Sequence, residues 1–503
     1  MLKRIYISII FIFLGQFFKA QEEFITVWKP SMNQTSPVVS GTPSTDIQIW
    51  LPVRGNNFTI YWEEIGYPQN HSTLTNVSSA YQILINFSEP LNPNSADATY
   101  RLKITNGNGN FHAIRFADST LFPNGTGLVG DTDKLLTIEQ WGTTPWSTMK
   151  QAFSMCRNMD ITATDIPNLS NITSLQNAFV ACNNLVGNSS MANWDISNVT
   201  DLSLTFSACL LFNQPIGSWN TSNVTLMSST FSTATTFNQP LSNWNTSKVE
   251  DTAGMFLNAT AFNQPIGNWD MSKNKNMEFM FYGTNFNLPL ANWNTSQVTK
   301  MSYMFKNAPL FNQNIENWNT SNVVNTEFMF ENATNFNQNL GNWNLTSLST
   351  AMFILNNTGL DCLNYSRTIK GWSLNSITPN NIYLANVNPS KYASDITIDR
   401  NNLLAKGWFF QGDTLGSCSV LSTFEVNSKD LFTIYPNPVT DFIHIKNLKS
   451  SNSTYKIIDA NGRIVSQGKV SEDQIDIRNL VKGNYILQVK TQQAVKNLKF
   501  IKN

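Results

Sequence analysis

The chain has 503 residues, of which 13% are charged, and 33 basic against 33 acidic residues give a formal net charge of zero. This balance argues against a nucleic-acid-binding protein, which carries a basic footprint, and against a general attraction to anionic membranes. The length allows three or four domains.

Residues 1–20 have the pattern of a secretory signal peptide. Lys3 and Arg4 precede an apolar run at residues 5–18, and the small residue Ala20 follows. The run is shorter than the roughly 20 residues that a membrane-spanning helix needs. We therefore expect cleavage between Ala20 and Gln21, and no membrane span in the rest of the chain.

Short alternating stretches between Pro-, Gly- and Asn-rich gaps predict a β-rich domain at residues 21–140. The predicted strands cover residues 46–51, 57–62, 81–87, 100–104 and 111–116. Because the end of a repeat array exposes apolar surface, this domain is expected to cap the repeats that follow.

A unit of about 25 residues is repeated about nine times at residues 141–360. Tryptophans recur 24 or 25 residues apart, at Trp194, Trp219, Trp244, Trp269, Trp293, Trp318 and Trp343. Phenylalanines follow at matching spacing, at Phe153, Phe179, Phe206, Phe231, Phe256, Phe281, Phe305, Phe330 and Phe353. Such a period indicates stacked coils, and we expect these side chains to form their shared core rather than an exposed sugar-binding strip.

Within one coil, Val224, Met227, Phe231 and Ala234 follow the spacing of one helix face, and Ser222 is placed to cap that helix. Residues 237–241 are expected to be extended. The predicted fold class is therefore an α+β repeat solenoid, leucine-rich-repeat-like, with one short helix and one short strand per coil. An N-terminal β domain and a C-terminal β-sandwich flank it.

Polar residues also recur once per coil. The asparagines at Asn213, Asn238, Asn263, Asn287, Asn312 and Asn337 are expected to form a ladder that bonds backbone groups, with a ligand-binding row as the alternative. The threonines at Thr221, Thr246, Thr295 and Thr320 suggest a weaker idea, an ice-binding array.

The unit W-N-T-S-x-V-T-x-M-x-x-M-F resembles the repeat of the BspA-like leucine-rich-repeat bacterial surface proteins over residues 141–360. The coils with Phe153 and Cys156, and with Phe179 and Cys182, resemble the A-F-x-x-C core of the treponemal class of these repeats. The resemblance implies a cell-surface or secreted protein that functions in adhesion or in binding proteins or other cells.

After a terminal cap at residues 361–420 and a linker at 421–431, residues 432–503 form a separate β domain. Asn461 and Gly462 predict a hairpin turn there. The domain resembles the C-terminal sorting domain (type A) of type IX secretion through Tyr435, Pro436, Asn437, Pro438, Gly483 and Tyr485. That resemblance implies the type IX secretion machinery as a partner. It also implies a location outside a Gram-negative cell, either secreted or on the outer cell surface.

Cys156, Cys182 and Cys209 stand three residues after a repeat Phe, where later coils have Ala. They predict small buried side chains and free thiols, because helices packed 8–10 Å apart are too distant for a disulfide. Cys362 and Cys418 bracket the cap, and in an exported chain they are expected to pair, with two unpaired thiols as the alternative.

No motif predicts a catalytic residue, a metal site or a cofactor. Asp131 and Asp133 hint at calcium, but a solvated turn is the expected structure. The leading hypothesis is a non-enzymatic repeat protein that binds an extended protein or glycan. The alternative is a polysaccharide-degrading enzyme with carboxylates such as Glu250, Asp251 and Glu278.

Specificity is expected from residues that vary at two fixed coil positions. These are Lys248, Lys273, Gln297 and Asn322 at one, and Asp201, Asp251, Lys300 and Asn325 at the other.

Overall fold

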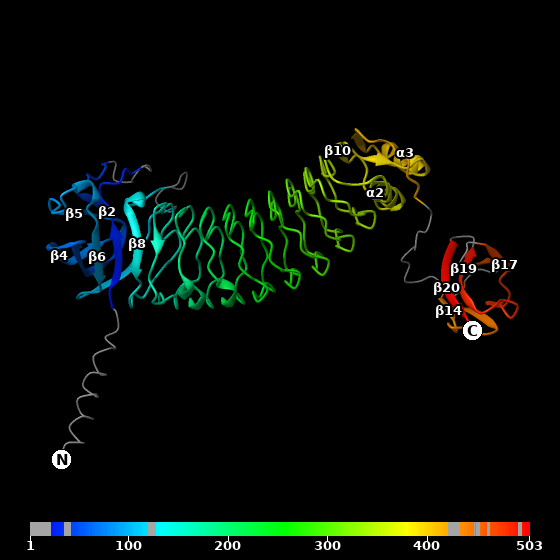
Figure 1. The fold of residues 1–503 in the computed structure, drawn as a ribbon, viewed down its shortest axis with the longest axis horizontal. Coiled ribbons are helices and arrows are strands. Elements are labelled where there is room, and N and C mark those ends of the chain that lie inside the picture. Colours follow the sequence, from blue (N-terminus) through cyan, green and yellow to red (C-terminus); the bar gives the residue numbers. More distant parts are fainter. Residues whose placement is uncertain are drawn as a thin grey trace, which may run out of the picture. The chain divides into compact units, whose positions relative to one another are not determined.

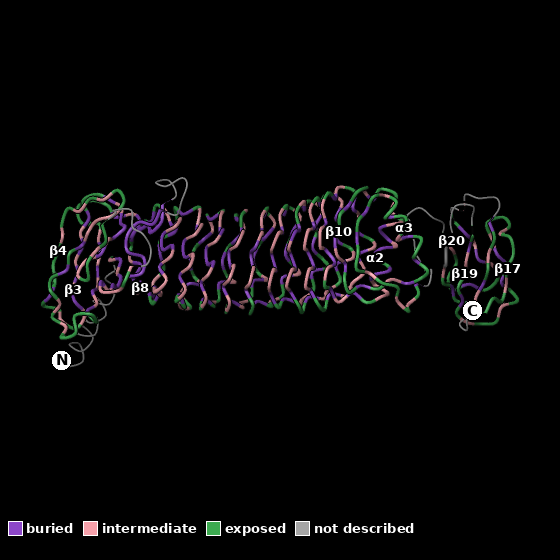
Figure 2. Tube along the Cα trace, turned by 90° about the horizontal axis from the view of Figure 1, so that it is seen from above, coloured by how far each residue is buried: buried purple, intermediate pink, exposed green. Residues whose placement is uncertain are grey.

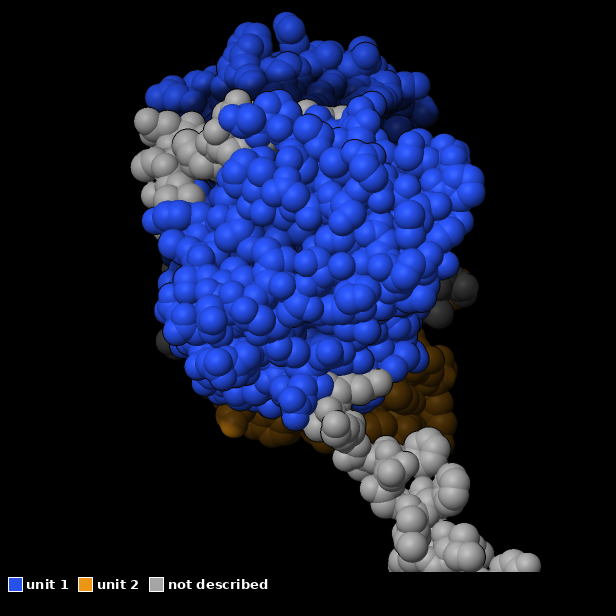
Figure 3. All heavy atoms as spheres, turned by 90° about the vertical axis from the view of Figure 1, so that its left-hand side faces the viewer, with its two compact units in different colours: residues 1–420 blue, residues 421–503 orange. Residues whose placement is uncertain are grey.

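The computed structural model describes residues 22–34, 42–118, 127–420, 433–446, 448, 453–459, 463–490 and 495–503. The chain divides into two compact units, residues 1–420 and residues 421–503, which are coloured separately in Figure 3. The predicted signal peptide with Ala20 and Gln21, the linker, and the predicted turn at Asn461 and Gly462 lie outside the described residues.

Unit 1 begins with a seven-stranded sheet (Figure 1). Six of its strands follow the order β4-β3-β6-β1-β8-β9, and the seventh, β7, pairs with β3. Its strands are β1 (Phe24–Trp28), β3 (Val53–Glu64), β4 (Tyr67–Ser79), β6 (Tyr100–Thr105), β7 (Asn110–Ile114), β8 (Leu135–Gln140) and β9 (Asp160–Ile161). A separate pair joins β2 (Gln48–Leu51) to β5 (Ile83–Asn86), and short 3-10 turns cover Ser95–Asp97 and Thr132–Lys134.

Alternation explains the strand β6, where Tyr100, Leu102 and Ile104 are buried while Arg101 and Lys103 lie on the other face. The five strands predicted from alternation are confirmed, with ends that shift by a few residues. The 13-residue strand β4 was not predicted, because its side chains are almost all polar.

The predicted fold class is wrong. Described residues hold only two α-helices, α2 (Cys362–Leu374) and α3 (Thr397–Ala405), and both lie after the repeats. Strands in several small sheets make up most of the other regular structure. Residues 162–360, all described, contain only turns, two 3-10 segments (Ser189–Asn193 and Ile216–Ser218) and isolated β-bridges. The 25-residue units are therefore not leucine-rich-repeat-like coils with a helix and a strand.

Backbone hydrogen bonds of alternating direction replace the predicted helix. In the coil that starts at Trp219, every second N–H from Met227 to Thr233 donates to a carbonyl of the next coil: Met227 to Asp251, Ser229 to Ala253, Phe231 to Met255 and Thr233 to Leu257, at 2.6–2.9 Å. The N–H groups between them donate three residues back within the coil: Thr230 to Met227, Ser232 to Ser229 and Ala234 to Phe231. Parallel bridges continue this ladder from Ser174 to Thr350.

This division of N–H groups excludes a helix for two reasons. A helix uses its N–H groups within one coil, so it would leave few to hold the coils together. The backbone also turns left-handed at Ser229 (φ 54°) and Thr233 (φ 59°), which interrupts any helical run. Ser222 caps no helix; its N–H instead bonds to the side chain of Asn220 at 3.2 Å.

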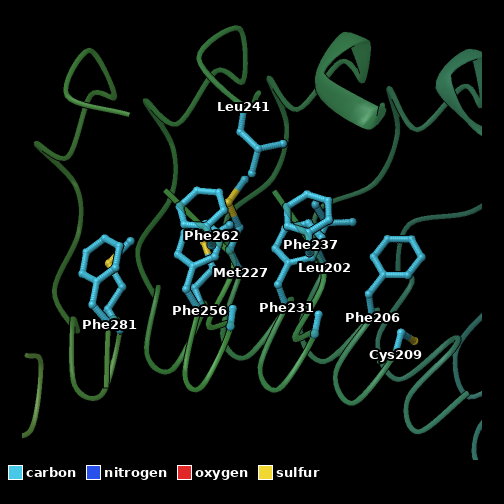
Figure 4. Packing of buried hydrophobic residues seen from close by; sticks show 14 of the residues in the cluster. Leu202, Phe206, Cys209, Met227, Phe231, Phe237, Leu241, Phe256, Phe262 and Phe281 are labelled. Atoms are coloured by element: carbon cyan, nitrogen blue, oxygen red, sulfur yellow. The ribbon is translucent and has the colours of Figure 1, made fainter. Parts of the chain in front are cut away.

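The core consists of aromatic rows along the stack, as predicted. The repeat rings Phe206, Phe231, Phe256, Phe281, Phe305 and Phe330 are fully buried and stack with centroids 5.5–5.9 Å apart. A second Phe row packs on the first, with Phe231 and Phe237 only 4.0 Å apart (Figure 4). These offset-stacked rings contribute contact energy beyond the area that they bury.

Each repeat Trp is at most 3% exposed, so the row offers no open face for a sugar. From Trp219 to Trp343, the indole N–H donates to a carbonyl of the preceding coil at 2.8–3.2 Å. Trp372 of α2 repeats this bond to Leu340, so the cap continues the row.

The asparagine ladder is confirmed. The Oδ1 atom of Asn312 accepts from the backbone N–H of Asn337 at 2.9 Å and from Gln338 at 2.7 Å, and equivalent bonds run from Asn213 to Asp361. The row is therefore occupied by structural bonds rather than free for a ligand.

The cap contains α2, α3 and two pairs of short parallel strands, β10 (Tyr383–Asn386) with β12 (Phe409–Gln411) and β11 (Lys391–Tyr392) with β13 (Thr414–Leu415), besides a 3-10 turn at Ser394–Ile396. A disulfide joins Cys362 at the start of α2 to Cys418, with Cα atoms 6.0 Å apart. Asp361 caps α2 by accepting the N–H of Asn364 at 2.7 Å.

Unit 2 contains two sheets around one core of its own. One has the order β14 (Thr433–Tyr435), β15 (Phe442–Lys446), β18 (Gln474–Asp476). The other has the order β17 (Ile464–Lys469), β16 (Thr454–Ile458), β19 (Gly483–Lys490), β20 (Val495–Lys502). A pocket of about 600 Å³, open to solvent, is lined by residues that include Asn437, Tyr485, Ile486, Phe500 and Ile501.

Candidate binding surface

The surface of the repeats is set by two left-handed backbone positions in every coil. Position 1 is the repeat Trp of each coil, or Pro167 in the second coil. On this numbering, position 11 has φ of 54–60° in all nine coils and position 15 has φ of 52–66°. Buried and partly exposed residues are interspersed along each coil (Figure 2), and the residues at these two positions are partly exposed in most coils.

Position 11 changes character along the stack. From the first coil to the ninth it is occupied by Gln151, Asn177, Leu204, Ser229, Gly254, Phe279, Tyr303, Phe328 and Phe353. Bulky residues are rare at positive φ, whereas Gly and Asn adopt it readily. The last four coils therefore place aromatic side chains where the backbone least favours them. We call Phe279, Tyr303, Phe328 and Phe353 the aromatic row.

The four rings form a regular stack. Their centroids are 4.4, 4.7 and 5.2 Å apart in order, with interplanar angles of 8°, 17° and 32°. All four side chains are partly exposed. Because each ring covers the face of its neighbour, the row presents ring edges to solvent.

This arrangement corrects one sequence assignment. Phe353 was placed in the buried Phe series, but it stacks on Phe328 at position 11, and Leu355 takes the core position of its coil.

Charged and amide side chains border the aromatic row. The Nζ atom of Lys306 lies 4.4 Å from the ring centroid of Phe328 and 2.5 Å from the carboxylate of Glu331. At position 15, Asn332 donates to Asn307 and Asn357 donates to Asn332, both at 2.8 Å. These bonds hold the border of the row in one arrangement.

The carboxylates considered for catalysis lie in ion pairs or in the bridge ladder. Glu250 bonds Lys275 at 2.6 Å, and Glu278 lies 3.7 Å from Lys300 and accepts from Ser302. The bond from Lys275 lowers the pKa of Glu250. Asp251 is a member of the backbone ladder, as are Asp201, Lys300 and Asn325 from the proposed specificity positions.

The other proposed specificity position is position 5, which is more exposed to solvent. It is occupied by Lys248, Lys273, Gln297 and Asn322. Lys248 bonds Asn223 at 2.8 Å, and the side chain of Asn322 donates to the carbonyl of Ser296 at 2.7 Å. Lys273 and Gln297 are both exposed.

The threonines of the proposed ice-binding array are buried. Thr221, Thr246, Thr295 and Thr320 are at most 2% exposed, and each hydroxyl donates to a backbone carbonyl of the next coil. They offer no face to ice.

Cys156, Cys182 and Cys209 are free and buried. The reason differs from the predicted helix spacing, because the repeats contain no helix. The thiols of Cys182 and Cys209 donate to the carbonyls of Phe153 and Phe179 in the preceding coils, at 3.1 and 3.0 Å. Burial raises the pKa of all three thiols, which keeps them unreactive.

Asp131 and Asp133 are buried, so the expected solvated turn is wrong. Asp131 accepts from Ser44 and from the N–H of Trp50, and burial raises the pKa of its carboxyl. Among the described residues, no three His, Cys, Asp or Glu side chains gather as a metal ion requires.

Three of the sorting-motif residues contact the C-terminal strand β20 of unit 2: Asn437, Gly483 and Tyr485. Asn437 accepts the N–H of Ile501 at 2.9 Å and donates to the carbonyl of Lys499 at 3.0 Å. Tyr485 is buried against Phe500 and Tyr435 is half exposed. Gly483 begins β19, while Pro436 and Pro438 flank Asn437 in the turn after β14.

Comparison with known proteins identifies two regions. Residues 433–503 match the secretion system C-terminal sorting domain, which supports export by type IX secretion to the outside of the cell or to its outer surface. Residues 173–287 and 261–372 match a family described as Mycoplasma protein of unknown function, DUF285. No curated protein matches the chain. In the part of the chain that the structure describes, no helix has the length and apolar character to cross a bilayer.

If the aromatic row is a surface feature and not part of the core, its removal must cost little stability. We expect Tyr303→Asn to change the free energy of unfolding by less than about 1 kcal/mol, because lost stacking is offset by relief of the left-handed strain. The matched control, Phe305→Ala, removes a buried ring of the same coil and should cost roughly 3–5 kcal/mol. Urea denaturation measures both, and equal losses would place Tyr303 in the core.

Proposed function

We propose that this exported chain is a non-enzymatic binding protein and that the aromatic row is its contact surface for an extended partner. The observation that carries the proposal is the placement of four bulky rings at left-handed positions. Such a conformation costs an L-residue roughly 1–2 kcal/mol. The five earlier coils avoid aromatic residues at this position, so neither the backbone nor the core demands them.

The chemistry of the row is that of a protein interface. Aromatic side chains are enriched at the centres of interfaces, and the neighbouring Lys306–Glu331 pair supplies a polar rim. Neighbouring coils are spaced like neighbouring strands of a sheet, so four coils extend the row over about 14 Å. This length suits several residues of an extended polypeptide.

A polypeptide is favoured over a glycan. Sugars stack on ring faces, and here the faces of Tyr303 and Phe328 are covered by the rings on either side. The exposed ring edges suit contact with apolar side chains instead.

The enzymatic alternative has less support. A glycosidase needs one carboxyl group with a raised pKa as general acid. The pKa of Glu250 is instead lowered by Lys275, and Glu278 is engaged by Lys300 and Ser302.

A protein array and a glycan array, both probed with the labelled full chain, test the binding proposal. We expect signals on the protein array that fall roughly tenfold or more in the Tyr303→Asn/Phe328→Asn double variant. Thr334→Asn, an exposed change in the same repeats, should leave them intact. The proposal would be contradicted if the double variant gave the same signals as the unaltered chain. It would also be contradicted if the full chain released sugar from a polysaccharide panel.

Export is tested by truncation after Leu421. Unit 2 has its own core, so its removal should leave unit 1 folded. We expect the truncated chain to stay folded in the periplasm, while the full chain reaches the surface or the medium and loses the sorting domain. Cell fractionation with a protease-accessibility assay measures this, and undiminished truncated protein outside the cell would refute the sorting role.

A further inference from the structure

The N-terminal sheet has one covered edge and one open edge. At the covered edge, β9 belongs to the first coil, and the next coil bonds to it. The N–H groups of Val186 and Gly187 donate to the side-chain carboxylate of Asp160 at 2.9 and 2.7 Å, and the side chain of Asn188 donates to the backbone carbonyl of Ile161 at 3.2 Å. At the other edge lies β4, on the outer side of the sheet in Figures 1 and 2. Within the described residues, the backbone of β4 pairs only with β3.

An open edge strand normally carries protection against pairing, such as charged side chains, Pro or a bulge. In β4, the register with β3 is unbroken from His71 to Leu74, and irregularities lie on either side, between Tyr67 and His71 and between Leu74 and Val77. The other protecting features lie at the ends of the strand, at Pro68 and at Asn76, whose φ is 55°. Residues 69–75 between them contain no Asp, Glu, Lys or Arg, and five of these seven side chains are exposed. This run therefore offers unpaired N–H and carbonyl groups to another strand.

We propose that β4 pairs antiparallel with β4 of a second copy of this chain and forms a two-fold symmetric dimer with one continuous sheet. A two-fold interface brings identical surfaces together, so a charged edge would repel itself, and this edge is uncharged. Opposite His71, the carboxylate of Glu63 is already neutralised by Arg101 and Lys103, at 3.4 and 3.5 Å.

Side chains of the run also suit self-pairing. The run exposes the hydroxyl side chains of Ser72, Thr73 and Thr75. Ser and Thr side chains on neighbouring strands form favourable cross-strand hydrogen bonds. The formal net charge of zero for the whole chain removes long-range repulsion between two copies. Pairing would join two sets of repeats and so give a bivalent binding protein, with the gain in avidity that two linked sites provide.

Sedimentation analysis of the purified full chain tests the proposal. We expect a species of twice the chain mass, which the Thr73→Lys/Thr75→Lys variant converts to monomer with an unchanged circular dichroism spectrum. The control Thr334→Lys/Asn335→Lys adds the same charge at exposed positions of the repeats and should remain dimeric.

Amide exchange of residues 69–75 in the unaltered chain gives a second readout that needs no variant. Exchange should be slow at high protein concentration and should accelerate on dilution. Three results would each overturn the proposal. They are a monomer at every protein concentration, a dimer that persists in the Thr73→Lys/Thr75→Lys variant, and an exchange rate that does not change on dilution. Protection that appears only after a different protein is added would show that β4 receives a foreign strand instead.

Discussion

The repeats depend on one constraint: the backbone N–H groups of each coil must serve two purposes at once. In the segment from Met227 to Ala234, and at the equivalent positions of other coils, alternate groups close turns within the coil, and those between them bond to the next coil, as for Ser232 and Phe231. No coil can satisfy its own backbone, and an unpaired buried N–H is costly, so a single unit has no stable form alone. Stability comes from stacking, in which the Phe, Trp and Asn rows add contacts in the same direction.

The same constraint generates the surface. To aim every second N–H at the next coil, the chain turns left-handed at positions 11 and 15, and position 11 lies at the surface. In the first five coils, the residues at position 11 are Gly254, three polar residues and Leu204, and none of them is aromatic. In the last four coils, the same position carries the stacked rings of the aromatic row, beside Lys306 and Glu331. A structural requirement of the backbone thus provides fixed sites whose side chains can vary with function.

Part of the structure can be predicted from the sequence. The period locates the Trp and Phe rows, because a bulky apolar residue at fixed spacing must meet its counterparts in a stack. The asparagine ladder follows from amide chemistry, and strands such as β6 follow from strict alternation.

The rest depends on contacts between distant residues. The pattern of Val224, Met227, Phe231 and Ala234 fits a helix face, but it fits a row of turns equally well, and the choice is made by bonds to residues about 25 positions away. The aromatic row was missed because sequence carries no direct sign of positive φ, and Phe353 was assigned to the wrong row for that reason. The strand β4 lacks apolar alternation, since its partner β3 supplies most of the buried surface.

Amide hydrogen exchange resolved to single residues tests the central claim, that alternate N–H groups bond across coils. In the coil that begins at Trp219, Ser229 and Thr233 sit at left-handed positions outside any helix or strand, yet their N–H groups donate to the next coil at 2.8 and 2.6 Å. The account predicts that these two amides exchange as slowly as those of Ser232 and Ala234, which close turns within the coil, because all four open only when the stack opens. Rapid exchange at Ser229 and Thr233, with protection confined to Ser232 and Ala234, would mean independent turns without cross-coil bonds and would contradict it.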